Sequence, residues 1–410
     1  MSDERRYYTS SHAICSVILL LTTLLIGDVS GQQPKRSAES PPSPLLPAEQ
    51  AWVQELSALP AAAGVLDRDR VYVPLQQGGT VALTRETGAL AWTNPLGTPW
   101  PLLSGPGSVI AVTSDEVAAI DRATGAMLWR VPLPAHSLAP AVVAGESIVI
   151  ALDSGDVIAL HISDGSFIWS VKVEGLAAPA ALTADDTAVY LTMAGSRMTA
   201  IALKSGGVIW VVTLEGTLSP PTVGKNRVFV GSTSNIFYAL DARNGVITWR
   251  WGAEMVGGDV IGSAVDNDLA FFAGLDNLLH AVNQGNGNQR WKQPTPTRPI
   301  APPQAFGGLV AIFGVSPAIA TFNARTGAPI GTYVIPTAAG ATTPPVPKGP
   351  PLIDPDLRPF RVALVVVTTD GRAIGLRPMG MVFQESAPVP FAELPGKSLP
   401  RERLPVTTPQ

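Results

Sequence analysis

The stretch AIDRATGAMLW, residues Ala119–Trp129, contains the pattern that decides the fold. In it an alanine is followed by a glycine six residues later and by a tryptophan four residues after that. The pattern occurs six times, and successive tryptophans from Trp92 onwards are 37, 40, 41, 39 and 42 residues apart. A seventh copy, Thr321–Gly331, keeps Gly327 but lacks the alanine and the tryptophan. The glycines and tryptophans of the six complete copies are Gly88 and Trp92, Gly125 and Trp129, Gly165 and Trp169, Gly206 and Trp210, Gly245 and Trp249, and Gly287 and Trp291. Repetition at this period indicates one supersecondary unit per copy.

A run rich in Val, Ile and aromatic residues precedes each copy, with turn residues on both sides, as in Ser147–Asp153. Eight such runs occur, the last at Val362–Thr368, and none has the period of a helix. A proline often opens a strand upstream of the run, as at Pro140 and Pro179. Each unit is therefore predicted to contain four short strands, and such units stack around an axis as propeller blades. The predicted fold is all-β: an eight-bladed β-propeller of four-stranded blades.

The two ends of the repeat predict how the ring closes. The eighth run is followed by one further strand, Arg372–Gly375, which has no matching tryptophan. Near the N-terminus, Ala51–Leu56 has the character of an isolated fourth strand, and Trp52 lies 40 residues before Trp92. We predict that this N-terminal strand completes the C-terminal blade, because such closure removes an exposed sheet edge. The alternative places Phe383 in the tryptophan position.

Residues 1–31 are predicted to be a signal peptide. Ala13–Ile26 is 14 residues long and uncharged, which is short of the roughly 20 residues that span a bilayer. Small residues at Val29–Gly31 suit cleavage. An uncleaved N-terminal anchor is the alternative. Either way, the rest of the chain is expected to be exported to the periplasm or cell envelope. The sequence leaves open whether the protein associates with a membrane through this segment or through a partner.

Proline-rich stretches set the other expected boundaries. Residues 32–50 are predicted to be a flexible linker, 51–385 the propeller, and 386–410 a disordered tail. Within the propeller, residues 337–359 are predicted to be a proline-rich insertion. Cys15 lies near the start of the apolar run rather than after it, which argues against a lipoprotein.

The composition excludes several classes of protein. With 46% hydrophobic and 15% charged residues, the chain is not wholly disordered. The net charge of -4 gives no basic surface for nucleic acid. A single cysteine rules out an intramolecular disulfide and a multi-cysteine metal site.

No catalytic, cofactor-binding or metal-ligating residues are predicted. The acidic segments Asp67–Asp69, Asp185–Asp186 and Asp266–Asp268 have the oxygen ligands that Ca²⁺ requires. Each, however, precedes a strand at a turn, where Asp and Asn are favoured for their local hydrogen bonds. His136, His161 and His280 share no metal-like spacing and are expected to be ordinary blade or loop residues.

One connection stands apart from the others. Trp249 is followed by a second tryptophan, Trp251, and then by Met255. Both residue types are enriched where protein surfaces bind partners, so Trp251 and Met255 are candidate partner-binding residues. The alternative is that Trp251 alternates to the other face of its blade.

The Ala-x-Asp-x-x-x-Gly-x-x-x-Trp pattern resembles the repeat of the quinoprotein-type (PQQ-like) β-propellers over about residues 51–376, and Asp121 and Asp241 keep its third position. In that superfamily the tryptophan packs between blades and the glycine forms a turn, which implies structural roles for Trp52 and the motif residues. The length, the eight units and the N-terminal strand are most similar to the BamB family. These are propeller subunits of the bacterial outer-membrane β-barrel assembly machinery, without enzymatic activity.

Two departures from the BamB family stand out. Members are usually lipoproteins, and they dock on the barrel subunit through long connections after the third and fourth motif tryptophans. Here the connections Glu174–Ala177 and Glu215–Leu218 are short, and no docking residue can be assigned.

Two functional hypotheses follow from the sequence. The first is a non-catalytic exported scaffold that binds other envelope proteins. The second, which rests on the superfamily resemblance alone, is a quinone-dependent oxidoreductase. The lone cysteine argues against the second, because that dehydrogenase class places its cofactor over a disulfide between adjacent cysteines.

Overall fold

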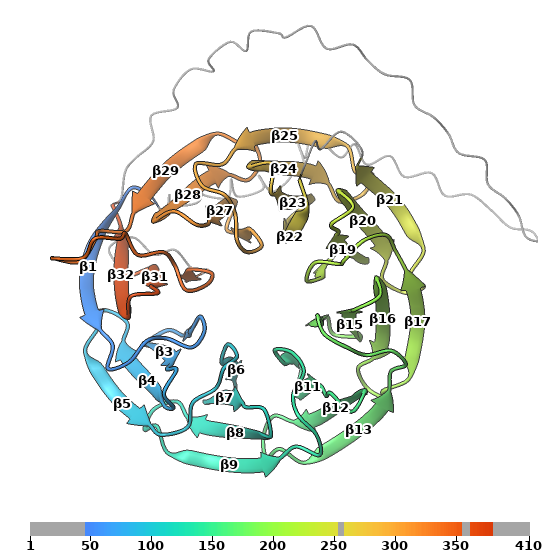
Figure 1. Ribbon diagram of the computed structural model, residues 1–410, viewed down its shortest axis with the longest axis horizontal. Helices are drawn as coiled ribbons and strands as arrows, with labels where there is room; N and C mark the ends of the chain where they lie inside the picture. Colours follow the sequence, from blue (N-terminus) through green and yellow to red (C-terminus); the bar gives the residue numbers. More distant parts are fainter. Residues whose placement is uncertain (1–45, 253–257, 355–360, 380–410) are drawn as a thin grey trace, which may run out of the picture. The chain divides into compact units, whose positions relative to one another are not determined.

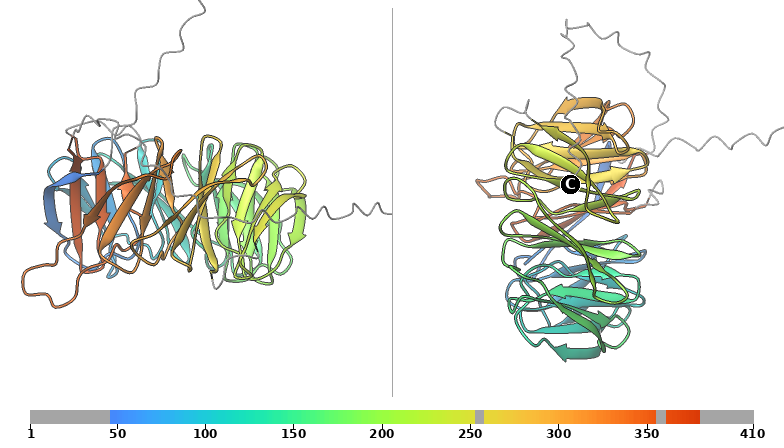
Figure 2. Two further views of the ribbon diagram at one scale, coloured as in Figure 1. Left: turned by 90° about the horizontal axis from the view of Figure 1, so that it is seen from above. Right: turned by 90° about the vertical axis from the view of Figure 1, so that its right-hand side faces the viewer.

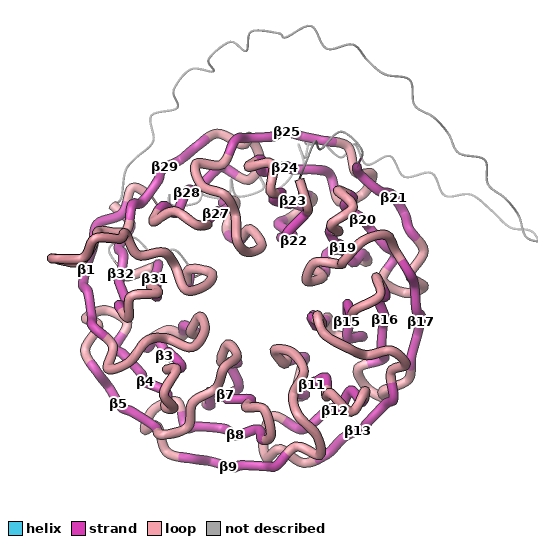
Figure 3. Tube along the Cα trace, viewed as in Figure 1, coloured by secondary structure: helices cyan, strands magenta, loops and turns pink. Residues whose placement is uncertain are grey.

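The computed structural model describes residues 46–252, 258–354 and 361–379. In this part of the chain there is no helix, and strands and loops alternate around the whole ring (Figure 3). Eight four-stranded antiparallel sheets form the blades. The all-β, eight-bladed prediction is confirmed, and the ring is seen along its axis in Figure 1 and from its edge in Figure 2.

Blades 1 to 7 each use four strands that are consecutive in sequence, from the innermost to the outermost. The innermost strands are β2 (Val65–Leu66), β6 (Leu103–Gly105), β10 (Val142–Ala144), β14 (Ala181–Ala184), β18 (Thr222–Gly224), β22 (Val260–Asp266) and β26 (Gln304–Phe306). The second strands are β3 (Arg70–Pro74), β7 (Ser108–Val112), β11 (Ser147–Ala151), β15 (Ala188–Met193), β19 (Arg227–Gly231), β23 (Leu269–Gly274) and β27 (Leu309–Phe313).

The repeated motif spans the third and fourth strands. The third strands are β4 (Thr80–Thr84), β8 (Glu116–Asp121), β12 (Asp156–His161), β16 (Arg197–Ala202), β20 (Ile236–Asp241), β24 (Leu278–Asn283) and β28 (Ala318–Asn323). The fourth are β5 (Leu90–Asn94), β9 (Met127–Pro132), β13 (Phe167–Lys172), β17 (Val208–Thr213), β21 (Ile247–Gly252), β25 (Gln289–Pro294) and β29 (Pro329–Val334). The motif glycine turns the chain between these two strands.

Blade 8 closes the ring with strands from both ends of the chain. β30 (Leu352–Ile353), β31 (Leu364–Val367) and β32 (Arg372–Pro378) come from the C-terminal side, and β1 (Ala48–Glu55) pairs antiparallel with β32. Trp52 lies opposite Gly375 in this pairing. Closure by the N-terminal strand is therefore confirmed. Phe383, the alternative, lies outside the described residues.

The N-terminal boundary of the ring differs from the expected one. β1 begins at Ala48 and Leu46 is fully buried, so the end of the predicted 32–50 linker belongs to blade 8. The predicted 337–359 insertion also contributes structure, because β30 pairs with β31 and Pro347 forms a bridge with Thr368. An innermost strand needs a pairing partner on one side only, which explains how a proline-rich segment can supply it.

The hydrophobic core lies between blades rather than within one. The second and third strands are buried on both faces, and side chains from neighbouring blades form each cluster, as where Val149 and Val157 of blade 3 meet Val189 and Leu191 of blade 4. In the outermost strands burial alternates, as expected for residues that project to opposite faces. The continuous apolar runs in the sequence thus correspond to strands covered on both sides.

Candidate binding surface

The motif tryptophans and glycines join seven of the eight pairs of neighbouring blades. All seven motif glycines have a left-handed backbone, with φ between +69° and +75°. A Cβ at any of them would lie within 3 Å of the indole ring from the preceding blade. Glycine is therefore required for two reasons, its backbone conformation and the close approach of the ring. The pairs are Trp52 on Gly88, Trp92 on Gly125, Trp129 on Gly165, Trp169 on Gly206, Trp210 on Gly245, Trp249 on Gly287 and Trp291 on Gly327.

Most of these indoles also hold the following blade by a hydrogen bond. The Trp169 Nε1–H donates to the carbonyl of Leu203 at 2.7 Å, and Trp52 Nε1–H donates to that of Arg85 at 2.8 Å. Trp92, Trp210, Trp249 and Trp291 make the equivalent bond at 2.9 to 3.1 Å. The motif thus provides both packing and a specific blade-to-blade contact.

Two of the three acidic turns, those of Asp67 and Asp185, hold the strand that follows them, whereas Asp266 accepts a hydrogen bond from the Gly308 N–H of blade 7. Asp185 accepts hydrogen bonds from the backbone N–H groups of Thr187 and Ala188 and from the hydroxyl of Tyr190. Partial burial alone would raise the pKa of Asp185, but these hydrogen bonds outweigh it and lower the pKa below its usual value. Burial, and then Asp185, raise the pKa of Tyr190. Asp67 and Tyr72 form the same arrangement in blade 1. Among the described residues no group of three or more His, Cys, Asp or Glu could hold a metal ion.

Trp251 lies between blades 5 and 6. It is half-buried, and its ring centroid lies 5.1 Å from that of Phe272 and 4.8 Å from that of His280. Because Trp251 is two residues after Trp249 in β21, both face blade 6, so the alternative that Trp251 turns to the other face is wrong. Met255 lies outside the described residues.

His280 is a buried histidine without hydrogen-bond partners. Its side chain stacks on Phe272 with ring centroids 4.9 Å apart, and Asp276 Oδ2 lies 3.5 Å from Nε2 without a hydrogen bond. Burial lowers its pKa, and the negative charge of Asp276 opposes this effect only in part. The sequence predicted an ordinary blade or loop residue at His280 and gave no sign of its aromatic surroundings.

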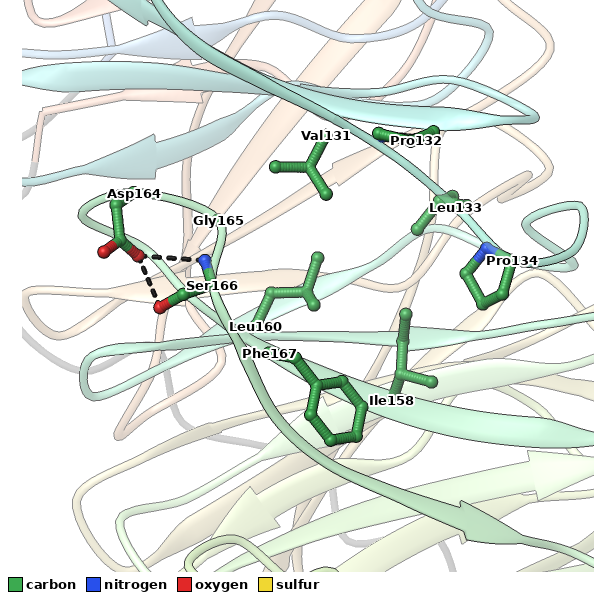
Figure 4. A pocket seen from close by; sticks show the side chains of 10 residues that line it. All are labelled: Val131, Pro132, Leu133, Pro134, Ile158, Leu160, Asp164, Gly165, Ser166 and Phe167. Atoms are coloured by element: carbon green, nitrogen blue, oxygen red, sulfur yellow. Dashed lines mark hydrogen bonds between the residues drawn. The ribbon is translucent and has the colours of Figure 1, made fainter.

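An apolar pocket of about 360 Å³ opens at the corresponding position between blades 2 and 3 (Figure 4). Val131 stands two residues after Trp129, as Trp251 does after Trp249, and Ile158 takes the place of His280. Both of these side chains line the pocket. Phe167, with 64% of its surface exposed, lies at the pocket beside Asp164, Gly165 and Ser166.

A second hollow, which we call the loop groove, lies on the loops of blades 5 to 7. Its volume is about 470 Å³. It is formed by connections that enter these blades and by loops that follow their second strands. Ile300 and Val315 line it with 46% and 58% of their surfaces exposed. The other residues around it are Thr217, Leu218, Ser219, Thr233, Asp259, Val260, Ile261, Leu275, Arg298 and Pro299.

Comparison with known proteins identifies the family. A family model described as outer membrane protein assembly factor BamB matches residues 46–170, 113–214, 180–259 and 200–344. The chain belongs to the BamB family. The matches overlap and together extend over blades 1 to 7, as expected for a family defined by a repeat that recurs from blade to blade. None of the curated proteins compared matches this BamB-family chain.

Solved structures share the fold of this BamB-family protein at low sequence identity. BamB from Moraxella catarrhalis is 18% identical with a TM-score of 0.61, over 80% of this chain and 99% of that one. Sqt1 of Saccharomyces cerevisiae is 11% identical with a TM-score of 0.65, over 80% and 98% of the two chains. The quinohemoprotein alcohol dehydrogenase ADHIIG from Pseudomonas putida HK5 is 12% identical with a TM-score of 0.57, over 84% and 78%. These likenesses show the fold alone.

Among the described residues there is no helix long and apolar enough to span a membrane. The predicted signal peptide lies outside that part of the chain.

Proposed function

We propose that this BamB-family propeller is a non-catalytic, exported scaffold that binds another subunit of the outer-membrane β-barrel assembly machinery. The observation that carries the proposal is the BamB family match, which extends across residues 46–344. The expected periplasmic or envelope location of the chain agrees with such a role.

The loop groove is the surface we propose for this docking. The connections β13–β14 and β17–β18 are short, but residues 217–219 of the second one help to line the loop groove, which offers a hollow for the apolar side chains of a partner. Ile300 and Val315 are large apolar residues that water reaches, and an exposed apolar hollow with a polar border is typical of a protein interface. Trp251 and Met255 remain predicted partner-binding residues; Trp251 lies in β21, where it packs against Phe272 and His280 of blade 6.

Co-purification tests the scaffold role and its surface together. The tagged protein is isolated from the envelope of its own organism, and the barrel subunit of the assembly machinery is quantified by mass spectrometry. We expect that subunit with the wild-type protein, and its loss with Ile300→Asp/Val315→Asp. Leu90→Asp, at a residue 59% exposed on the outer strand of blade 1, is the matched control and should retain it. A preparation that never contains assembly subunits would contradict the scaffold role, whereas equal recovery with both variants would contradict the surface.

Titration with pyrroloquinoline quinone and Ca²⁺ tests the oxidoreductase alternative. For a scaffold we expect no saturable change in absorbance and no reduction of an electron-accepting dye. Saturable binding with turnover of an alcohol would establish the alternative and overturn our proposal.

A further inference from the structure

The fourth strand of every blade has one unpaired edge on the rim of the ring (Figure 1). The backbone hydrogen bonds show which residues point outward along these edges. In blade 4, Leu214 N–H donates to the carbonyl of Ser196 at 2.9 Å. Because hydrogen-bonded and non-hydrogen-bonded pairs alternate in an antiparallel sheet, the backbone groups of Val211 and Thr213 point away from the blade. Outward positions are therefore one and three residues after the motif tryptophan.

Proline placement supports this assignment. β9 and β25 have Pro132 and Pro294 three residues after their tryptophans, and Pro95 follows β5 at the same position. Proline has no N–H, so in a paired strand it is tolerated where that N–H would face solvent.

Seven of the eight outer strands carry a feature that opposes the addition of another strand. Charged residues and prolines at a sheet edge both discourage such pairing. β1 contains Glu49 and Glu55, β5 is followed by Pro95, β9 contains Arg130 and Pro132, β13 contains Lys172, β21 contains Arg250, β25 contains Arg290, Lys292 and Pro294, and β29 begins with Pro329. β17 (VIWVVT) has neither a charge nor a proline.

The side chains of β17 are also unusually apolar for a rim. Val208, Ile209 and Val211 are 46%, 44% and 48% exposed, whereas Trp210 between them is buried. A row of outward N–H and C=O groups at a two-residue spacing is matched by the backbone of another extended strand. The lack of charge along β17 favours a strand whose neighbouring side chains are uncharged and apolar.

We propose that the outer edge of β17 binds an extended strand of a partner protein, in which apolar residues alternate with polar ones, by adding it to blade 4. This inference rests on the proposed function, because outer-membrane barrel strands have that alternating pattern. Main-chain hydrogen bonds from Val211 and Thr213 would hold the added strand, and Val208, Ile209 and Val211 would cover its apolar side chains.

The test copies the edge of β25 onto β17. Val211→Lys/Thr213→Pro reproduces Lys292 and Pro294, which the chain already has at the same positions of blade 6. The matched control is Thr332→Lys/Val334→Pro at the same positions of β29, where both side chains are exposed. Melting temperature and circular dichroism check that both variants fold.

The probe is a fluorescent nine-residue peptide in which Thr alternates with Val and Tyr between terminal Lys residues, and fluorescence anisotropy measures its binding. We expect saturable binding to the wild-type protein and to the β29 control, at least about tenfold weaker binding to the β17 variant, and none of a peptide with proline at its centre. No binding to the wild-type protein, or equal binding to both variants, would overturn the proposal.

Two further outcomes are informative. Light scattering that shows a wild-type dimer, converted to monomer by Val211→Lys/Thr213→Pro, would assign the edge to a second copy of this chain and overturn the proposal. Because peptide binding is measured with purified protein, it can succeed when co-purification with assembly subunits fails, so the two proposals can be rejected separately.

Discussion

The side chain of Leu46 occupies the place that the missing tryptophan leaves at Gly331. Gly331 pairs with Thr321, as Trp291 pairs with Ala281 one blade earlier. A Cβ at Gly331 would lie 2.8 Å from the Cβ of Leu46, which is itself fully buried. Leu46, two residues before β1, therefore fills the one blade interface at which the motif is incomplete.

Replacing Leu46 by alanine should destabilise the ring. Truncating a buried leucine leaves a cavity and costs about 2–4 kcal/mol, here at the joint between blades 7 and 8. Val53→Ala, at a residue of β1 that is 40% exposed, should cost less than about 1 kcal/mol. Urea unfolding followed by tryptophan fluorescence measures both. Equal midpoints for the two variants would show that Leu46 does not contribute to this joint.

Trp169→Ala should cost more than the truncation of its neighbour on the same strand. Trp169 is 6% exposed, stacks on Gly206 and donates a hydrogen bond to Leu203. We expect a loss of about 3–5 kcal/mol. Phe167→Ala, at a 64% exposed residue, is the control and should lose less than about 1 kcal/mol. Trp129→Ala should fall between them, because Trp129 is only partly buried and its indole lies against Gly165, which lines the pocket between blades 2 and 3.

Thermal unfolding measures this series. If Trp169→Ala had the same melting temperature as Phe167→Ala, rather than a much lower one, the packing role of the motif tryptophan would be rejected.

His280 should make the protein less stable as the pH falls. Its pKa is lowered by burial, so the unfolded chain binds a proton at a higher pH than the folded protein does. The contribution is therefore fully present above the unfolded pKa of about 6.5 and is lost as the pH falls below it. The negative charge of Asp276 raises the pKa of His280, and the positive charge of Lys292 lowers it. Trp251 and Phe272 exclude water from the imidazole ring.

His280→Phe should remove part of this acid sensitivity, since phenylalanine can stack on Phe272 without taking up a proton. The measurement is the urea midpoint between pH 8 and pH 5. His161→Gln, at an exposed histidine of blade 3, should follow the wild-type curve. A His280→Phe curve parallel to the wild-type one would assign the acid sensitivity to other groups.

The fold could be predicted because the repeated residues are those that join the blades. Only glycine fits at Gly206 below the Trp169 indole, so the sequence displays each interface directly. Leu46 was missed because it substitutes for a motif residue from a distant part of the chain. β30 was missed because a two-residue strand among prolines has no recognisable period.

The candidate surfaces depend on which side chains meet across blades, and the sequence does not reveal this. The pocket beside Phe167 is lined by Val131 and Ile158, which stand at the positions that Trp251 and His280 hold in blades 5 and 6. β17 stands out only after each outer strand has been placed on the rim and its outward residues have been identified.

Closure of the ring can be tested by two deletions from a mature chain that begins at residue 32. Removing residues 32–45 keeps Leu46 and all of β1, and the melting temperature should stay close to that of the mature chain.

Removing residues 32–57 takes away β1 and with it the pairing of Trp52 opposite Gly375. It also exposes the edge of β32 and the surface of Gly88 that the Trp52 indole covers. An uncovered edge of this kind promotes aggregation, so the longer deletion should melt at a lower temperature and form large species in size-exclusion chromatography. Arg361 still pairs with Glu86 at 2.8 Å, and the buried Arg85 still pairs with Asp354, between blades 8 and 1. These contacts do not replace the backbone pairing and the packing that the loss of a whole strand removes. Removing residues 386–410 is the control for chain shortening and should leave the melting temperature unchanged. If the 32–57 deletion melts with the mature chain, β1 does not close the ring in solution, and a strand that includes Phe383 becomes the better candidate.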